Sequence, residues 1–201
     1  DVGQGFSAFI RTGSGQNILV DGGGFSTRSR FDTGRNIVAP FLWRHQVRRL
    51  DAVILTHPET DHLRGLVYIL ENFRVNCLIK NPDQRKTVLY CALMTAARDR
   101  NIPVIVVDRF PLEMTFGTAG LTFLGPRLAH GSLNDNSLVF RLCFQDFSIL
   151  FTGDIFTLRE ERLCTLYPGQ IRSRVLLAPH HGSATSSGKI FLDKVRPHSV
   201  I

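Results

Sequence analysis

Three apolar runs of this chain end in residue types that bind metal ions. The runs are AVILTHPETDH (Ala52 to His62), FSILFTGD (Phe147 to Asp154) and RVLLAPHHGS (Arg174 to Ser183). Short runs of Val, Ile and Leu are typical of buried strands, and functional groups of α/β sheets gather at the carboxyl ends of such strands. If the three ends converge, imidazole and carboxylate groups surround one pocket, which would suit metal-dependent chemistry. The residues that would line this pocket are His57, Glu59, Asp61, His62, Asp154, His180 and His181.

The spacing of the His57–His62 motif could serve two metal ions. Alternate positions of an extended segment point to the same side, whereas His62 turns toward a second position as the chain enters a helix. Asp61 would lie at the N-terminus of that helix, where an acidic side chain is favoured. The alternative is a polar corner between strand and helix, with Asp61 as a cap and the histidines on the surface. Asp154 and the adjacent histidine pair favour the metal site.

Hydrophobic periodicity predicts strands that alternate with helices. Strands that pair in hairpins alternate with strands that are separated by helices, which indicates two mixed sheets covered by helices. The expected fold class is therefore α/β, a four-layered αβ/βα sandwich. The expected strands are near 6–11, 17–20, 51–56, 75–79, 104–107, 121–124, 137–144, 147–152 and 174–178, and the expected helices are 37–44, 61–70, 88–100, 158–167 and 189–195.

Composition places the chain among globular proteins. At 201 residues, with 43% hydrophobic and 20% charged residues, it is long enough for one well-buried domain, expected over residues 1–201. Its apolar runs are far shorter than the roughly 20 residues of a transmembrane helix. The chain starts on Asp1 without Met and stops in Pro197–Ile201, which resembles the start of a strand. We therefore expect a fragment that lacks its last C-terminal elements.

Cysteine spacing indicates the state of the thiols, and the distribution of charge indicates possible partners. The four cysteines are widely spaced without a zinc-finger pattern, so we expect buried, reduced thiols. The net charge is +7, and the segment 28–49 has one acid, Asp32, among its six arginines. This segment is either a solvated basic face or a track for a polyanion backbone, whose binding would weaken as salt rises. Its arginines are Arg28, Arg30, Arg35, Arg44, Arg48 and Arg49.

The ordered motifs carry a family resemblance. His57-x-Glu59-x-Asp61-His62 resembles the HxHxDH signature of the metallo-β-lactamase superfamily, and Asp21-Gly22-Gly23 and Thr152-Gly153-Asp154 match other landmarks of that fold. A longer set of segments resembles the C-terminal metallo-β-lactamase-like domain of ComEC-type DNA-internalisation competence proteins. These segments are Asp1–Gly5, Ile18–Gly23, Val38–Leu42, Asn136–Val139, Leu150–Asp154 and Pro179–Ser183.

The resemblance implies a function and a cellular setting. It implies a metal-dependent phosphodiesterase-like activity on DNA, with single-stranded DNA as the expected partner. It also implies attachment to the rest of a polytopic membrane channel on its outer, extracytoplasmic face, although these residues contain no membrane span. The biological role that it implies is degradation of the DNA strand that is not imported during natural transformation.

The resemblance also implies roles for the site residues. Two divalent ions, Mn²⁺ or Zn²⁺ with Mg²⁺ as a further candidate, would assist phosphodiester hydrolysis. Asp154 would bridge them and Asp61 would orient or deprotonate the attacking water, so these two residues are the catalytic candidates. Glu59 replaces the second histidine of the superfamily motif, which hardens the site toward Mn²⁺ or Mg²⁺. The complete expected ligand set is His57, Glu59, Asp61, His62, Asp154, His180 and His181, with Asp21 supporting it from behind.

Other polar residues allow two interpretations. Asn136 and Ser137 either hydrogen-bond a phosphate or form a turn, and Gly182 and Ser183 either offer N–H groups to a phosphate or cap a turn. His130 is the one candidate for a further family histidine; coordination and a surface loop are both open, and it stays outside the expected ligand set.

Two other functions remain open at the level of sequence. The same scaffold supports hydrolysis of small esters, thioesters or lactones, because a fold does not fix its substrate. A non-catalytic module that docks DNA near a channel is the second alternative. The basic segment 28–49 favours DNA over a small ester.

Overall fold

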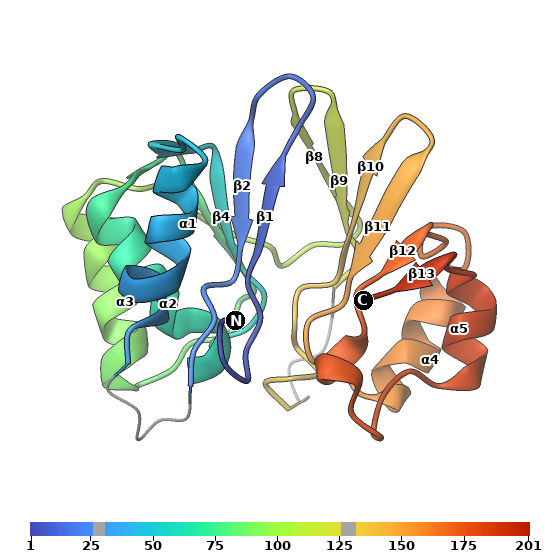
Figure 1. Cartoon of the computed structure of the whole chain (residues 1–201). Coiled ribbons are helices and arrows are strands. Elements are labelled where there is room, and N and C mark those ends of the chain that lie inside the picture. The colour runs from blue at the N-terminus through green and yellow to red at the C-terminus, as the bar shows by residue number, and fades with distance from the viewer. Residues whose placement is uncertain (26–30, 126–131) are drawn as a thin grey trace. The chain divides into compact units, whose positions relative to one another are not determined.

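The chain divides into two compact units, each with its own sheet and helices. A computed structural model describes residues 1–25, 31–125 and 132–201, and contacts group them into Asp1–Val106 and Val107–Ile201. Figure 1 shows the helices and strands that belong to each unit. The single domain expected over residues 1–201 stays a prediction.

The first unit is built on a mixed five-stranded sheet. Its order is β1-β2-β4-β6-β7, with an antiparallel β1/β2 hairpin and parallel pairing from β2 onward. Because parallel strands end at the same edge, Asp21, Thr56 and Asn81 follow β2, β4 and β6 at one side of this sheet. The strands are β1 (Ala8–Arg11), β2 (Asn17–Val20), β4 (Ala52–Leu55), β6 (Leu78–Lys80) and β7 (Val104–Val106), and a small parallel pair is formed by β3 (Arg49–Leu50) and β5 (Arg74–Val75).

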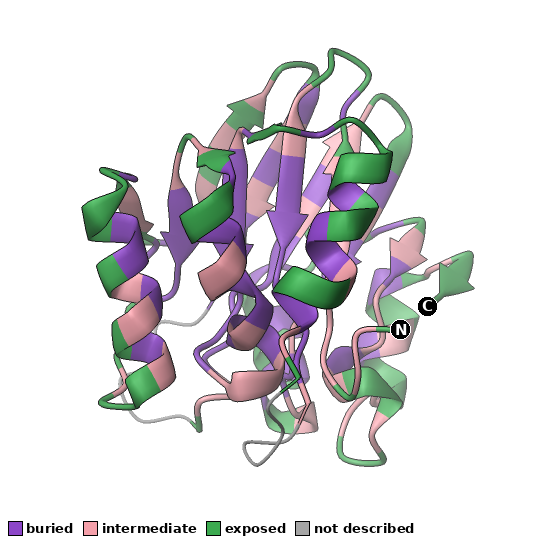
Figure 2. Ribbon diagram, turned by 60° about the vertical axis from the view of Figure 1, so that its left-hand side comes forward, coloured by how far each residue is buried: buried purple, intermediate pink, exposed green. Residues whose placement is uncertain are grey.

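Helices of the first unit bury one face each. A π-helical turn η1 (Gly34–Val38) leads into α1 (Ala39–Arg44), and α2 (Thr60–Asn72) and α3 (Val88–Asp99) follow. The α2 residues Leu66, Ile69 and Leu70 are fully buried, so the apolar stripe predicted from their spacing is confirmed. In Figure 2 the inner sides of these helices are buried and the outer sides exposed. Burying each such side chain contributes about 1.5–3 kcal/mol.

The second unit has a six-stranded sheet of order β13-β12-β11-β10-β9-β8. Antiparallel hairpins join β8 to β9 and β10 to β11, whereas β11, β12 and β13 are parallel. The elements are β8 (Leu112–Phe116), β9 (Ala119–Phe123), β10 (Phe140–Phe144), β11 (Phe147–Phe151), α4 (Thr157–Leu166), β12 (Val175–Leu176), η2 (Pro179–Gly182), α5 (Lys189–Val195) and β13 (Ser199–Val200).

Most of the predicted elements are present, with several differences. The predicted strand 75–79 is divided between β5 and β6, and the two-residue strand β3 was not predicted. The tight turn predicted at Gln145 joins β10 to β11, and Gln145 has a φ of 50°. Strand β8 was missed, because its side chains alternate between intermediate and exposed and form no continuous apolar run. Strand β10 begins at Phe140 rather than at Ser137, since the residues before it form a turn.

The cysteines are free, but they are not uniformly buried. Cys164 is buried, Cys77 and Cys143 are intermediate, and Cys91 is exposed, so the expectation of buried thiols was wrong for Cys91. No helix within the described ranges is both long and apolar enough to cross a bilayer.

The turn after β2 lies directly against helix α2. A Cβ atom added to Gly65 would lie 2.0 Å from the carbonyl oxygen of Gly22. The Gly22 N–H donates to the carbonyl of His62 at 2.7 Å, and the Gly65 N–H donates to that of Gly23 at 3.3 Å. The two backbones therefore touch where β2 ends and α2 begins.

We expect Gly65→Ala to destabilise the protein by about 2 kcal/mol or more, because the methyl group forces these backbones apart. Helix propensity alone would make alanine more stable than glycine by about 1 kcal/mol. The substitution would therefore stabilise the protein at a helical position with open space around it, whereas we expect it to destabilise the protein at Gly65. Gly120→Ala is the matched control, since its Cβ would meet no atom within 4 Å. Urea denaturation measures both; unchanged stability of Gly65→Ala would contradict the close approach.

Candidate metal centre

A buried carboxylate organises the candidate ligands of the first unit. Asp21 is fully buried and accepts three hydrogen bonds, from the Thr56 N–H at 2.8 Å, the Thr56 hydroxyl at 2.7 Å and His62 Nδ1 at 2.8 Å. Burial raises the pKa of Asp21, and the interactions with His62 and Thr56 oppose that rise. The Asp21 backbone has a φ of 53°, the left-handed conformation that aims this side chain from the turn.

This network selects the tautomers of two histidines. Because His62 donates from Nδ1 to Asp21, its Nε2 carries the lone pair. Thr56 gives its single hydroxyl proton to Asp21, so its oxygen accepts from His57 Nδ1 at 3.1 Å, and His57 also keeps a lone pair on Nε2. Metal-binding histidines are oriented by such a carboxylate or hydroxyl behind the ring. The donor set of the first unit therefore fits a divalent metal.

The acidic residues of the motif lie on either side of the helix start. Helix α2 begins at Thr60, so Asp61 is in its first turn and half-buried, while Glu59 occupies the N-cap position with extended backbone. The extended alternation assumed from sequence thus stops at Glu59. The Glu59 carboxylate lies 3.8 Å from the guanidinium of Arg85, and both side chains are about one-third exposed (33% and 37%). Such an exposed ion pair contributes little to stability.

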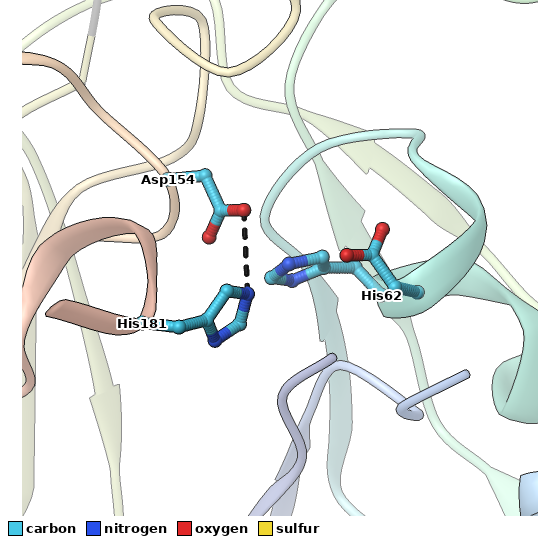
Figure 3. A group of neighbouring side chains, drawn as sticks. His62, Asp154 and His181 are labelled. Atoms are coloured by element: carbon cyan, nitrogen blue, oxygen red, sulfur yellow. Dashed lines mark ion pairs between the residues drawn. The ribbon is translucent and has the colours of Figure 1, made fainter. Parts of the chain in front are cut away.

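The second unit brings one acid and one histidine together. Asp154 follows β11 and is buried, and its N–H donates to the Ser137 hydroxyl at 3.1 Å. His181 Nε2 lies 3.4 Å from the Asp154 carboxylate oxygen Oδ2, as Figure 3 shows. Two ligands of a tetrahedral ion, each about 2.0–2.1 Å from it, are about 3.3 Å apart. This pair is therefore spaced as two ligands of one ion would be.

The two histidines of η2 have different surroundings. Both have positive φ angles, 50° for His180 and 54° for His181, and the His180 N–H donates to the carbonyl of Gly153 at 3.1 Å. The His180 ring meets Phe156 edge to face at 5.1 Å. Sequence left both histidines as candidates to close a metal site; His181 is the one paired with Asp154 in this unit.

The expected substrate-binding residues form turns. The Ser137 N–H donates to the Asn134 carbonyl at 2.9 Å, and Asn136, beside it, is buried. The Ser183 N–H donates to the His180 carbonyl at 2.9 Å, next to Gly182. The turn interpretation of these residues is thus observed, and their contact with a substrate stays a prediction.

Sequence reasoning missed a supporting acid, Glu160 in α4. Its buried carboxylate accepts the N–H groups of Ser187 at 2.6 Å and Gly188 at 2.8 Å, which fixes the loop after η2. Burial raises the pKa of Glu160, and these backbone hydrogen bonds oppose the rise. Nothing in the local sequence pattern distinguishes it from the exposed acid Glu161 beside it. His130 lies outside the described residues.

Comparisons with known proteins agree on the fold. A family model described as "Metallo-beta-lactamase superfamily" matches residues 1–199. The metallo-β-lactamase fold protein YhfI from Bacillus subtilis has a TM-score of 0.61 at 13% identity, over 98% of this chain and 77% of that chain. The predicted α/β sandwich of the metallo-β-lactamase type is confirmed.

The relatives include a protein named as a competence protein. The chain is 28% identical to "ComE operon protein 3" of Bacillus subtilis (strain 168), over 100% of this chain and 27% of that protein. It is 31% identical to "Competence protein ComA" of Neisseria gonorrhoeae, over 100% of this chain and 26% of that protein. The predicted resemblance is confirmed, and the chain spans about a quarter of the length of these relatives.

We expect Asp21→Asn to weaken metal binding about 10–100-fold, because the amide cannot accept all three hydrogen bonds that orient His62 and Thr56. Titration of the purified protein with Mn²⁺ or Zn²⁺ by calorimetry measures this effect without a substrate. Asp108→Asn, an exposed acid of the second unit, is the control and should bind like the unaltered protein. Equal affinities for both variants would remove the supporting role of Asp21.

Proposed function

Because the chain belongs to the metallo-β-lactamase superfamily, we propose that it is a metal-dependent hydrolase, and specifically a nuclease that cleaves phosphodiester bonds of DNA. The observation that carries the hydrolase proposal is the Asp21–His62 hydrogen bond, which leaves Nε2 of a buried histidine as a metal ligand. The tetrahedral spacing of Asp154 and His181 supports it from the second unit.

We propose that these candidate ligands bind two divalent metal ions. A family model that matches residues 1–199 supports this proposal. When bound, two divalent ions would supply a hydroxide nucleophile and neutralise charge on the phosphate. The residues proposed to hold them are His57, Glu59, Asp61, His62, Asp154, His180 and His181, with Mn²⁺ and Zn²⁺ as the leading ions.

The proposed roles follow from the surroundings of each side chain. Asp61, half-buried in the first turn of α2, accepts a proton from the attacking water or orients it. Thr56 and Asp21 hold the imidazoles of His57 and His62 in the required tautomers, so that no proton must move before a metal binds. Ser137 fixes the backbone of Asp154.

DNA is the proposed substrate on two grounds. One relative, "Competence protein ComA", carries competence in its name, and the chain has a net charge of +7, which attracts a polyanion. The proposed biological role is degradation of the strand that is not imported during transformation. In this role the chain would act on single-stranded DNA, attached to the rest of a membrane channel protein on the extracytoplasmic face.

We expect Asp154→Asn to lower Mn²⁺-dependent cleavage of linear single-stranded DNA at least about 100-fold, since it removes a charged ligand. Binding of the same DNA in EDTA should be no weaker, because less negative charge opposes it. Asp146→Asn, in the exposed β10–β11 turn, is the control. Small esters and lactones are tested in parallel; cleavage of these alone would replace the nuclease by a small-ester hydrolase. If the protein binds DNA but cleaves none of these substrates in the presence of metal, the nuclease proposal fails and a non-catalytic DNA-docking module replaces it.

A double-mutant cycle tests whether Asp61 and Asp154 act in the same chemical step. Asp61→Asn and Asp154→Asn should each abolish most of the activity, and the double variant should lose little more than either single variant. Residues that act independently would instead show additive losses in activation free energy. Additive losses would therefore show that the two carboxylates act independently, against the proposal.

Glu59 has two possible partners, a metal ion and Arg85, and paired substitutions distinguish them. If Glu59 is a metal ligand, Glu59→Gln should lower the affinity for Mn²⁺ more than the affinity for Zn²⁺, because a carboxylate is a harder donor than an amide. Arg85→Gln should leave both affinities unchanged or raise them. If Glu59→Gln binds both ions normally, Glu59 serves only its ion pair.

A further inference from the structure

A cavity lies at the far end of helix α2 in the first unit, away from the candidate ligands. Its volume is about 460 Å³, and it is lined by Trp43, Arg48, Asn72, Phe73, Arg74 and Arg100. Helix α2 runs from Thr60, beside the ligands Asp61 and His62, to Asn72 at the cavity, which is about 20 Å for 13 residues. The cavity is therefore separate from the candidate metal centre.

Three guanidinium groups of this cavity are not neutralised. Within the described ranges, Arg48, Arg74 and Arg100 make no ion pair, although neighbouring Arg49 and Arg98 pair with adjacent carboxylates at 3.1 Å and 3.0 Å. All three are exposed. Arg100 is the C-cap residue of α3, where a basic side chain complements the helix dipole, whereas Arg74 is the first residue of β5. Their convergence with Arg48 on one cavity creates a local excess of positive charge.

An exposed aromatic ring accompanies these charges. Trp43 is 50% exposed, and its ring stacks on the buried Phe73 with centroids 5.7 Å apart and planes 15° apart. The buried ring holds the indole in place, so the conformational cost of offering it to a ligand is small. A fixed aromatic platform surrounded by arginines is the combination that binds single strands, through base stacking and phosphate contacts.

We propose that this cavity binds single-stranded nucleic acid, with a base stacked on Trp43 and backbone phosphates held by Arg48, Arg74 and Arg100. An acidic peptide could use the same arginines, but it would gain nothing from the flat face of Trp43. The choice of nucleic acid rests on the proposed function, whereas binding at the cavity requires no metal. The two proposals can therefore fail separately.

The chain has a single tryptophan, so intrinsic fluorescence reports on this cavity directly. Titration with a short oligothymidylate in EDTA should quench Trp43 fluorescence in a saturable way, and added salt should reverse the quenching. Arg74→Gln and Arg100→Gln should each weaken binding about fivefold and reduce the slope of log affinity against log salt by about 0.7. Arg162→Gln removes the same charge from an exposed site of α4 in the second unit, outside the basic segment 28–49 and outside the cavity, and should change affinity less than about twofold.

Substitutions of Trp43 test the stacking contact, measured by the anisotropy of a labelled oligonucleotide. Trp43→Ala should weaken binding about tenfold, and Trp43→Phe should recover most of that loss. Thermal unfolding verifies that both variants fold, and the arginine variants test the cavity independently of Trp43. Three results would overturn the proposal. The first is an absence of quenching, and the second is an equal effect of Arg74→Gln and Arg162→Gln on affinity. The third is competition by polyglutamate that is equally strong for Trp43→Ala and for the unaltered protein. If DNA cleavage is absent but these binding effects hold, the nuclease proposal fails and the cavity assignment stands.

Discussion

The buried Asp21 carboxylate is the constraint on which the candidate centre of the first unit depends. A buried charge is tolerated only when it is hydrogen-bonded, and Asp21 meets this requirement with two donors from Thr56 and one from His62. The same three bonds decide which nitrogen of each nearby imidazole keeps its lone pair. The cost of burying one acid is thus offset by interactions that also fix the tautomers of two candidate metal ligands.

The second unit positions its candidate ligands on loops that hydrogen bonds hold at several points. Ser137 holds the backbone of Asp154, the Gly153 carbonyl holds His180, and Glu160 holds the loop that follows η2. His180 and His181 both adopt left-handed backbone conformations, which cost energy for residues other than glycine. Such conformations persist only when surrounding contacts enforce them, and they are common at functional sites.

The fold also sorts charge between the two ends of the first unit. Acids and imidazoles follow the carboxyl ends of the parallel strands, where Asp21 and His57 lie. Exposed arginines and Trp43 collect at the opposite end, where α1, α2 and α3 finish. The basic segment 28–49 contributes Arg48 to that end, but Arg74 and Arg100 come from outside it. Two of its arginines, Arg28 and Arg30, lie outside the described residues.

Sequence alone predicted most of the element types, the candidate ligands and the family, because hydrophobic periodicity and short motifs are local properties of the chain. It did not determine that His181 rather than His180 meets Asp154, that Arg85 approaches Glu59, or that Asp21 selects the imidazole tautomers. Strand β8 was not predicted because its side chains alternate between intermediate and exposed, and its backbone is recognisable as a strand only through its pairing with β9. Only the tertiary structure shows these features, because each is a contact between side chains or strands. The packing of strands and helices decides such contacts, and the neighbouring residues in the sequence do not.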